Sequence, residues 1–310
     1  MNKWFGSFIW LILVPALLSA CPAWAADTSG RLQVADQPRT YGVHVPDGPP
    51  PPGGFPLLMA FHGGGMQGEG MRRLTRFDDI ADARRFIAVY PDGIDKHWND
   101  GRATIKHPQD DVGFVSALLD RMEQDFAIDR GRVYAAGISN GALFAERLGC
   151  ELSGRIAAIA AVAGTLPRDL APRCQPSSPV AVMQIDGTAD PIMPFNGGAV
   201  ADFGGRGEGG QVLSVVDTVS FWARHDGCEG PATQQPLAPV VPMDGTRVLA
   251  TRYAGCVRGG RVELLTVADG GHAWPGGGQR APRIVIGVAS RQIDASQAIA
   301  EFFLSLPAAP

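Results

Sequence analysis

The sequence predicts an α/β fold in which a doubly wound, mostly parallel sheet carries helices on both faces. Short β-rich runs alternate along the chain with segments of helical periodicity, which is typical of β-α-β crossovers. Several of these runs are apolar at every position, as in strands that are covered on both faces. The 40 Gly and 25 Pro among 310 residues indicate many tight turns and loops rather than a helical bundle.

In chain order, the runs that predict strands are "TYGVHVP" (40–46), "FPLLMAF" (55–61), "FIAVYP" (86–91), "RVYAAGI" (132–138), "IAAIAAV" (156–162), "VAVMQID" (180–186) and "RVELLTVA" (261–268). The segments with helical periodicity between and after them are 69–85, 110–126, 141–149, 212–227 and 295–306. A Pro/Gly turn (46–56) and a Gly-rich loop (195–211), expected to be mobile, interrupt the alternation. Neither is long enough to separate two domains, so we expect a single domain over residues 28–308.

Residues 1–25 have the pattern of a signal peptide and are not expected to belong to the fold. Lys3 begins a short basic region, "FIWLILVPALLSA" is an apolar core, and "AWA" at 23–25 is a small-x-small cleavage site. The apolar run is short for a membrane span, and no other stretch approaches one. We therefore expect a secreted or periplasmic protein with no transmembrane span in the mature chain.

A second targeting signal overlaps the first. "LSAC" (18–21) also matches a lipobox, in which Cys21 would be lipidated and would tether the protein to a membrane. Pro22 is unusual directly after such a cysteine, and the "AWA" site is well formed. Release is therefore the favoured interpretation, and a lipid anchor at Cys21 is the alternative.

The mature chain keeps four cysteines: Cys150, Cys174, Cys228 and Cys256. An even number in an exported protein predicts disulfides, and four cysteines permit three pairings. We favour the nearest-neighbour scheme, Cys150–Cys174 and Cys228–Cys256, which closes two modest loops. No C-x-x-C or His/Cys cluster is present, so no metal site is expected.

The balance of charge argues against one class of partner. Lys and Arg together number 27 and Asp and Glu 31, which gives a net charge of −4. Without a basic patch, a nucleic acid is not an expected partner.

A serine between two glycines marks the junction of a predicted strand and a predicted helix. "GISNG" places Ser139 between Gly137 and Gly141, the G-x-S-x-G spacing of a nucleophile elbow, in which a sharp turn exposes a serine hydroxyl above the sheet. Two glycines so close together indicate crowding that only a hydrogen can tolerate. Ser139 is the candidate nucleophile.

A serine nucleophile needs a histidine base and an acid, which follow it in the order acid, His in this fold class. His272 lies in a Gly-rich loop directly after the last predicted strand and is the candidate base, whereas His225 suits the C-terminal end of a helix. The acid is expected after the strand that ends near Asp186. We prefer Asp190 in the following loop, with Asp186 turned into local turn bonding.

A tetrahedral intermediate also needs two N–H donors at its oxygen. The backbone of Asn140, next to the nucleophile, supplies one. The other is expected from "HGGG" (62–65), with Gly64 preferred and Gly63 and Gly65 as alternatives. Metal binding by His62 is the weaker interpretation of that motif. The HGGG motif, the G-x-S-x-G motif, the acid and the histidine follow one another in this order along the chain. Together they predict an α/β-hydrolase.

Several longer blocks give a more specific resemblance. "AFHGGG", "YPDGIDKHWNDGR", "RVYAAGISNGA", "DGTADPIMPFNGG" and "GGHAWPGG" resemble the polyhydroxybutyrate depolymerase and feruloyl esterase family of secreted α/β-hydrolases, over the chain from about residue 30 to its end. The resemblance implies hydrolysis of carboxylic esters without a cofactor, and places the nucleophile, acid and base on Ser139, Asp190 and His272. It also agrees with the cysteine pairing above. Asp186 departs from the family, which often has histidine there.

The expected substrates are polyhydroxyalkanoate oligomers or feruloyl and acetyl esters of plant polysaccharide. Trp98 and Trp274 lie nearest the site motifs, and they either form walls for an aromatic acyl group or sugar ring or pack the loops on which they sit. Two other functions stay open. One is a serine peptidase on the same fold, because the triad does not choose between ester and amide, and the other is a non-catalytic cell-surface binding protein.

Overall fold

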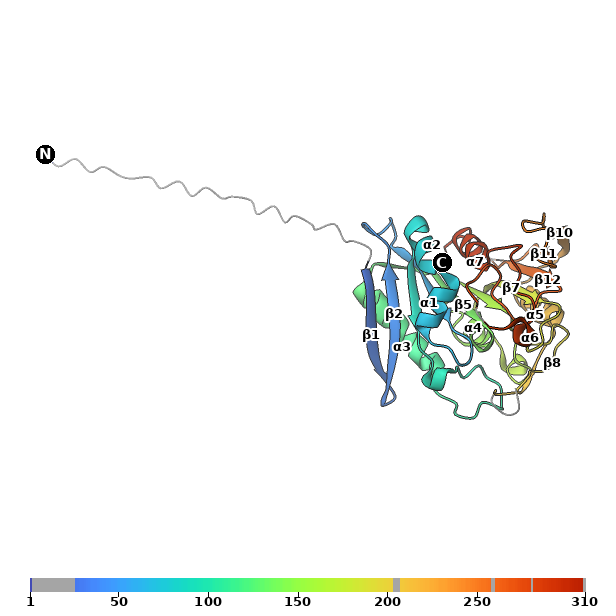
Figure 1. Ribbon diagram of the computed structural model, residues 1–310. Coiled ribbons are helices and arrows are strands. Elements are labelled where there is room, and N and C mark those ends of the chain that lie inside the picture. Colours follow the sequence, from blue (N-terminus) through green and yellow to red (C-terminus); the bar gives the residue numbers. More distant parts are fainter. Residues whose placement is uncertain (2–25, 203–206, 258–259, 280, 309–310) are drawn as a thin grey trace.

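One long sheet organises the protein. The computed structural model describes residues 1, 26–202, 207–257, 260–279 and 281–308, so the expected signal peptide and Cys21 lie outside the described residues. Across the sheet the strand order is β1 (Ala26–Val34), β2 (Gln37–Val45), β4 (Ile87–Pro91), β3 (Phe55–Phe61), β5 (Ile128–Ile138), β6 (Ala158–Val162), β7 (Ala181–Gly187), β12 (Val262–Ala268), β11 (Arg247–Ala254) and β10 (Gly230–Pro236). Figure 1 shows the sheet and labels several of its strands, among them β1, β2, β5, β7 and β12.

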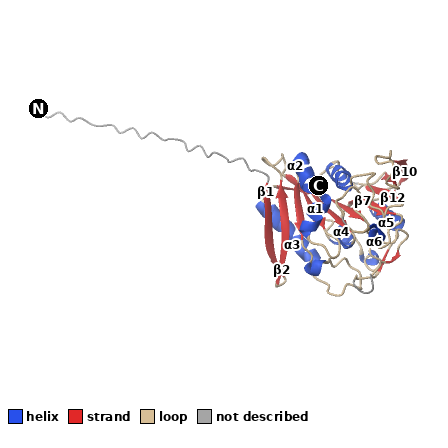
Figure 2. Ribbon diagram, in the orientation of Figure 1, coloured by secondary structure: helices blue, strands red, loops and turns tan. Residues whose placement is uncertain are grey.

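Six neighbouring strands run parallel and form the centre of the sheet: β4, β3, β5, β6, β7 and β12. Antiparallel strands extend it at both sides, β2 and β1 beyond β4 and β11 and β10 beyond β12. Helices lie beside the strands throughout (Figure 2). The expected α/β architecture with a mostly parallel sheet is therefore confirmed.

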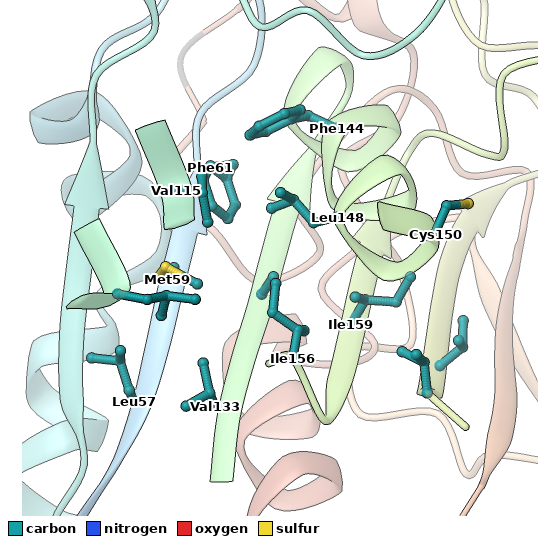
Figure 3. Packing of buried hydrophobic residues seen from close by; sticks show 14 of the residues in the cluster. Leu57, Met59, Phe61, Val115, Val133, Phe144, Leu148, Cys150, Ile156 and Ile159 are labelled. Carbon is teal, nitrogen blue, oxygen red and sulfur yellow. The ribbon is translucent and has the colours of Figure 1, made fainter. Parts of the chain in front are cut away.

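The helices cover both faces of this sheet. Side chains of α3 (Asp111–Asp125), α4 (Asn140–Glu151) and α5 (Val215–His225) contribute to one apolar core, and those of α1 (Gly68–Thr75), α2 (Phe77–Arg84) and α7 (Ala295–Leu304) to the other. β3 shows why two cores form: Leu57, Met59 and Phe61 enter the first and Leu58 and Ala60 the second, because successive strand side chains point to opposite faces. Figure 3 shows the first core.

Some elements differ from the sequence-based expectation. The segment 69–85 is two helices, because Arg76 adopts a left-handed conformation (φ 52°, ψ 36°). The chain direction changes there, so that both Leu74 and Phe77 reach the core. The strands β1, β10 and β11 were not expected, and the Gly-rich loop 195–211 contains the short pair β8 (Gly198–Ala199) and β9 (Gln211–Val212).

Short helical segments and two disulfides complete the described structure. The segments are η1 (Ile94–Lys96), η2 (Ala171–Arg173) and α6 (Arg283–Ile286). The disulfides are the expected pairs, Cys150–Cys174 and Cys228–Cys256. Within the ranges that the structure describes, no helix is long and apolar enough to cross a membrane.

Candidate active site

The candidate site residues lie just beyond the ends of four parallel strands. Gly64 follows β3, Ser139 follows β5, Asp190 follows β7 and His272 follows β12. Because all four strands run in the same direction, their carboxyl ends meet at one edge of the sheet, where α/β proteins place their ligands. The topology therefore brings together residues that are far apart in the sequence.

Ser139 occupies a strained turn between β5 and α4. Its φ of 56° and ψ of −124° are unusual for a residue with a side chain, and such strain is found at functional sites. The flanking glycines are required by space: a Cβ on Gly137 would lie 2.1 Å from the Gly141 carbonyl oxygen, and one on Gly141 would lie 2.3 Å from that of Phe61. The backbone crowding inferred from the sequence is confirmed.

A short hydrogen bond fixes the orientation of His272. Its Nδ1 donates to Asp190 Oδ2 at 2.8 Å, and among the residues that the structure describes Nε2 has no partner. The second oxygen of Asp190 accepts the backbone N–H groups of Ile192 and Met193 at 2.7 and 2.8 Å. This carboxylate is thus held by its own loop and turned toward the histidine.

Ser139 and His272 line the same cavity, which has a volume of about 290 Å³. Among the described residues no hydrogen bond joins the two side chains, and such bonds are commonly loose before a substrate binds. Part of the cavity lining is apolar and comes from Ile192, Met193 and Val200. The cavity therefore combines a small polar reaction edge with a surface suited to a hydrocarbon group.

Two backbone amides face this cavity beside the serine. Gly64 and Asn140 both line it, and within the described ranges neither amide has a hydrogen-bond acceptor. Asn140 begins α4, where first-turn N–H groups have no partner in the helix. The alternative donor Gly65 is less suitable, because its amide already donates to the Lys96 carbonyl at 2.9 Å.

Polar side chains brace the two loops that carry these amides. The Asn140 side chain accepts from the Trp98 amide at 2.8 Å and donates to the Trp98 carbonyl at 2.9 Å and to Asp100 at 2.8 Å. His62 donates from Nδ1 to the Gly63 carbonyl and accepts the Gly93 amide at Nε2. Burial lowers the pKa of His62. Both ring nitrogens are occupied, so His62 is not positioned as a metal ligand.

Neither tryptophan lies against the cavity. Trp98 is fully buried, stacks on Phe144 with ring centroids 5.0 Å apart and donates its Nε1 hydrogen to the His62 carbonyl. Trp274 is also fully buried, and its Nε1 donates to Ser296 at 2.9 Å. The expectation that these side chains form substrate walls is therefore wrong, and the packing interpretation describes both.

A group of buried polar side chains lies beneath the site on the α4 side of β7. Glu146 accepts hydrogen bonds from Gln184 Nε2 and Trp222 Nε1, and burial raises its pKa to about 8. Asp186 accepts the Gly164 amide at 3.1 Å, and its other oxygen has no partner among the described residues. Burial and the neighbouring Asp190 carboxylate raise the pKa of Asp186 well above its usual value. Its bond reaches the loop after β6, so the expectation of local turn bonding is wrong.

One cluster away from this cavity has ligand-type side chains. Oxygen and nitrogen atoms of Asp27, His44 and Asp78 lie within 4.8 Å of one another. The Arg72 guanidinium, however, pairs with both aspartates, and His44 bonds to Asp27 and Asp82 at 2.9 and 3.0 Å. Because Arg72 already supplies the positive charge that a metal ion would bring, the cluster is an ion-pair network.

Sequence reasoning missed several residues of the cavity. His97 lines the cavity, whereas its neighbour Trp98 was expected from the sequence as a candidate substrate-binding residue. The "KHWND" block contained the signal, but the sequence of a loop does not show which of two adjacent rings turns inward. Met193 and Val200 were missed because they lie in loops without a recognisable period.

Comparison with known proteins shows which proteins the chain resembles in sequence. It is 31% identical over 288 residues to the putative esterase NocK of Nocardia uniformis subsp. tsuyamanensis, and the match covers 90% of this chain and 83% of that protein. The chain belongs to this esterase family. The esterase is also 28% identical over 193 residues to feruloyl esterase B of Piromyces equi, across 60% of its own length and 34% of the relative's. Feruloyl esterase C of Emericella nidulans is 27% identical over 169 residues, which cover 52% of the esterase and 58% of that relative.

A solved structure agrees on the fold. Acetyl xylan esterase from Aspergillus awamori superposes on the esterase with a TM-score of 0.57 over 89% of this chain and 98% of that chain, at 12% identity. No family model matches the sequence. The esterase is thus a carboxylic ester hydrolase with the α/β-hydrolase fold, and the resemblance to feruloyl esterases inferred from its motifs is confirmed.

Proposed function

We propose that the protein hydrolyses carboxylic esters through an acyl-enzyme, with Ser139 as nucleophile, His272 as base and Asp190 as the acid that orients it. His272 removes the serine proton as Ser139 attacks the ester carbonyl, then returns it to the leaving alcohol. Gly64 and Asn140 stabilise the oxyanion. Water, activated by the same histidine, then releases the acyl group.

The observation that carries the proposal is the His272–Asp190 hydrogen bond at the cavity that holds Ser139. The carboxylate fixes the tautomer that carries hydrogen on Nδ1, and Nε2 is then the nitrogen able to accept a proton. The strained conformation of Ser139 and the unpaired amides beside it are further support.

The test is Ser139→Ala, measured with a p-nitrophenyl ester. We expect kcat to fall by several orders of magnitude, as losses of triad residues do, with an unchanged circular dichroism spectrum. The matched control is Ser220→Ala, a change at a half-buried helical serine of α5, which should leave kcat unaltered. Wild-type turnover in Ser139→Ala would reject the mechanism.

Two alternative functions are separated by direct assays. A serine peptidase would also hydrolyse the anilide with the same acyl group, although more slowly than the ester, whereas we expect the ester alone to be turned over. A non-catalytic binding protein would not react with a fluorophosphonate probe, and we expect covalent labelling at Ser139 that the alanine variant lacks.

The proposed substrates are esters of polyhydroxyalkanoate oligomers or feruloyl and acetyl esters of plant polysaccharide. Relatives named feruloyl esterase support the second class, and a panel of feruloyl, acetyl and hydroxybutyrate esters would rank them. We also propose export as a single domain over residues 28–308 after removal of residues 1–25. Amino-terminal sequencing of the exported protein should begin at Ala26, whereas a lipid anchor would place the first residue at Cys21.

A further inference from the structure

His97 stands at the edge of the cavity beside the proposed oxyanion donor. It follows the turn η1 and lines the same cavity as Ser139 and Gly64. A Cβ built on Gly64 would lie 2.9 Å from His97 Nε2 and 3.2 Å from its Cδ2, so the Nε2 edge of the ring faces Gly64. An amide nitrogen and a Cβ of one residue are about 2.5 Å apart, which puts Nε2 within roughly 5.4 Å of the Gly64 nitrogen.

The hydrogen bond on the opposite edge of the ring sets the tautomer of the neutral imidazole. His97 Nδ1 lies 3.1 Å from the Asp95 carbonyl oxygen. A carbonyl only accepts, so Nδ1 carries the hydrogen and Nε2 of the neutral ring is an acceptor. Within the described ranges Nε2 has no partner. An unpaired acceptor therefore lies close to the position of a bound ester carbonyl.

Apart from Ser139 and His272, the polar side chains that line the cavity beside His97 are already engaged. Arg102 donates to both oxygens of Asp100 and to the Gly209 carbonyl, and the Asn140 side chain is bonded as described above. Glu208 lines the cavity and accepts the Lys106 amide at 2.8 Å. His97 differs from these side chains because its Nε2 has no partner within the described ranges and faces Gly64.

We propose that His97 is a specificity residue for esters that carry a hydroxyl group close to the scissile carbonyl, with that hydroxyl donating to Nε2. The inference rests on the proposed function, because it uses the oxyanion position beside Gly64 as its reference point. The hydroxyl belongs either to the acyl group, as in a 3-hydroxyacyl ester, or to the alcohol, as in an ester of a vicinal diol or sugar. Both present the same donor at a similar distance from the carbonyl carbon.

The test compares substrates in which a methyl group replaces the hydroxyl. The acyl-side pair is p-nitrophenyl 3-hydroxybutyrate and 3-methylbutyrate, and the alcohol-side pair is 2-hydroxyethyl butyrate and propyl butyrate. For each pair the measured quantity is the ratio of kcat/KM for the hydroxylated and methylated ester. In His97→Ala we expect this ratio to fall about three- to tenfold in one pair, as for loss of a neutral hydrogen bond. The pair that responds identifies the source of the hydroxyl.

Two further variants separate recognition from a structural role. His97→Gln keeps a side-chain acceptor and should restore part of the lost ratio. Glu208→Gln changes a carboxylate acceptor elsewhere in the cavity lining and should leave both ratios as in the wild type. The proposal is overturned if both ratios are unchanged in an active His97→Ala enzyme, if kcat/KM falls equally for all four esters, or if Glu208→Gln abolishes the preference instead. Failure of the proposed function would appear separately, as activity that survives in Ser139→Ala.

Discussion

Glu146 should make the stability of the protein depend on pH in a way that one substitution removes. Its carboxyl group is fully enclosed between Gln184 and Trp222, and burial raises its pKa from 4.5 to about 8. Between these values the folded protein keeps a proton that the unfolded chain releases. The free energy of unfolding should therefore fall by about 1.4 kcal/mol for each pH unit over this interval and level off above it.

The perturbation is Glu146→Gln, which replaces the titrating group by a neutral one of similar shape. The introduced side-chain amide can still accept from Trp222, and the Gln184 side-chain carbonyl oxygen, unpaired among the described residues, can receive its N–H after rotation. The wild type should lose stability relative to the variant by roughly 4 kcal/mol between pH 5 and pH 8. Asp226, whose pKa is also raised, titrates in both proteins and cancels in the difference. The pKa of Asp186 is raised in part by Glu146, so the difference reports Glu146 together with its effect on Asp186.

The assay is urea unfolding at pH 5, 6, 7 and 8 with the disulfides intact, followed by tryptophan fluorescence. The control is Glu69→Gln, which changes an exposed carboxylate that pairs with Arg73 and should follow the wild-type curve. Parallel stability profiles for Glu146→Gln and the wild type would refute the reasoning, since they would show that the buried carboxyl does not titrate in this range.

Two further perturbations test the disulfide and the elbow. Cys228→Ser should lower the free energy of unfolding by about 2–5 kcal/mol and reduce turnover, because the Cys228–Cys256 bond joins the end of α5 to the segment that leads through β12 to His272; an unchanged melting temperature, or mass spectrometry of the unreduced protein that shows four free thiols, would contradict this. Gly141→Ala should destabilise by about 3 kcal/mol, the upper end of the usual cost of overpacking, because its Cβ would lie 2.3 Å from the Phe61 carbonyl oxygen. Gly42→Ala, with no atom within 4 Å of the new Cβ, is the matched control in chemical denaturation, and equal effects of the two changes would rule out the steric explanation.

The central strands could be predicted because burial on both faces leaves a direct trace in the sequence. β3 is buried at every position, and its continuous apolar run was sufficient to place it. The outer strands left no such trace: β10 is exposed at almost every position, and its polar residues resemble a loop. The break at Arg76 could not be predicted either. The helical spacing of apolar residues continues through this position, although the backbone there is not helical.

The candidate site shows the same division. Ser139 and the expected donor Gly64 are tied to motifs whose spacing follows from a backbone constraint, so the sequence alone placed them. Asp186 and His97 could not be assigned, because their environments depend on contacts across the fold: Asp186 bonds to the loop after β6, and His97 lies over Gly64. Contacts of that kind come from tertiary packing, which no local pattern contains.

The position of the candidate site residues just beyond the ends of four separate strands also bears on how the protein folds. Gly64 and His272 lie at opposite ends of the domain's sequence and meet only when β12 has paired with β7. Closing such long loops carries an entropic cost and makes parallel pairing slow. The core around β3 and β5 can form before that step, and the proposed catalytic centre cannot. During refolding, the return of ester hydrolysis would therefore report completion of the sheet.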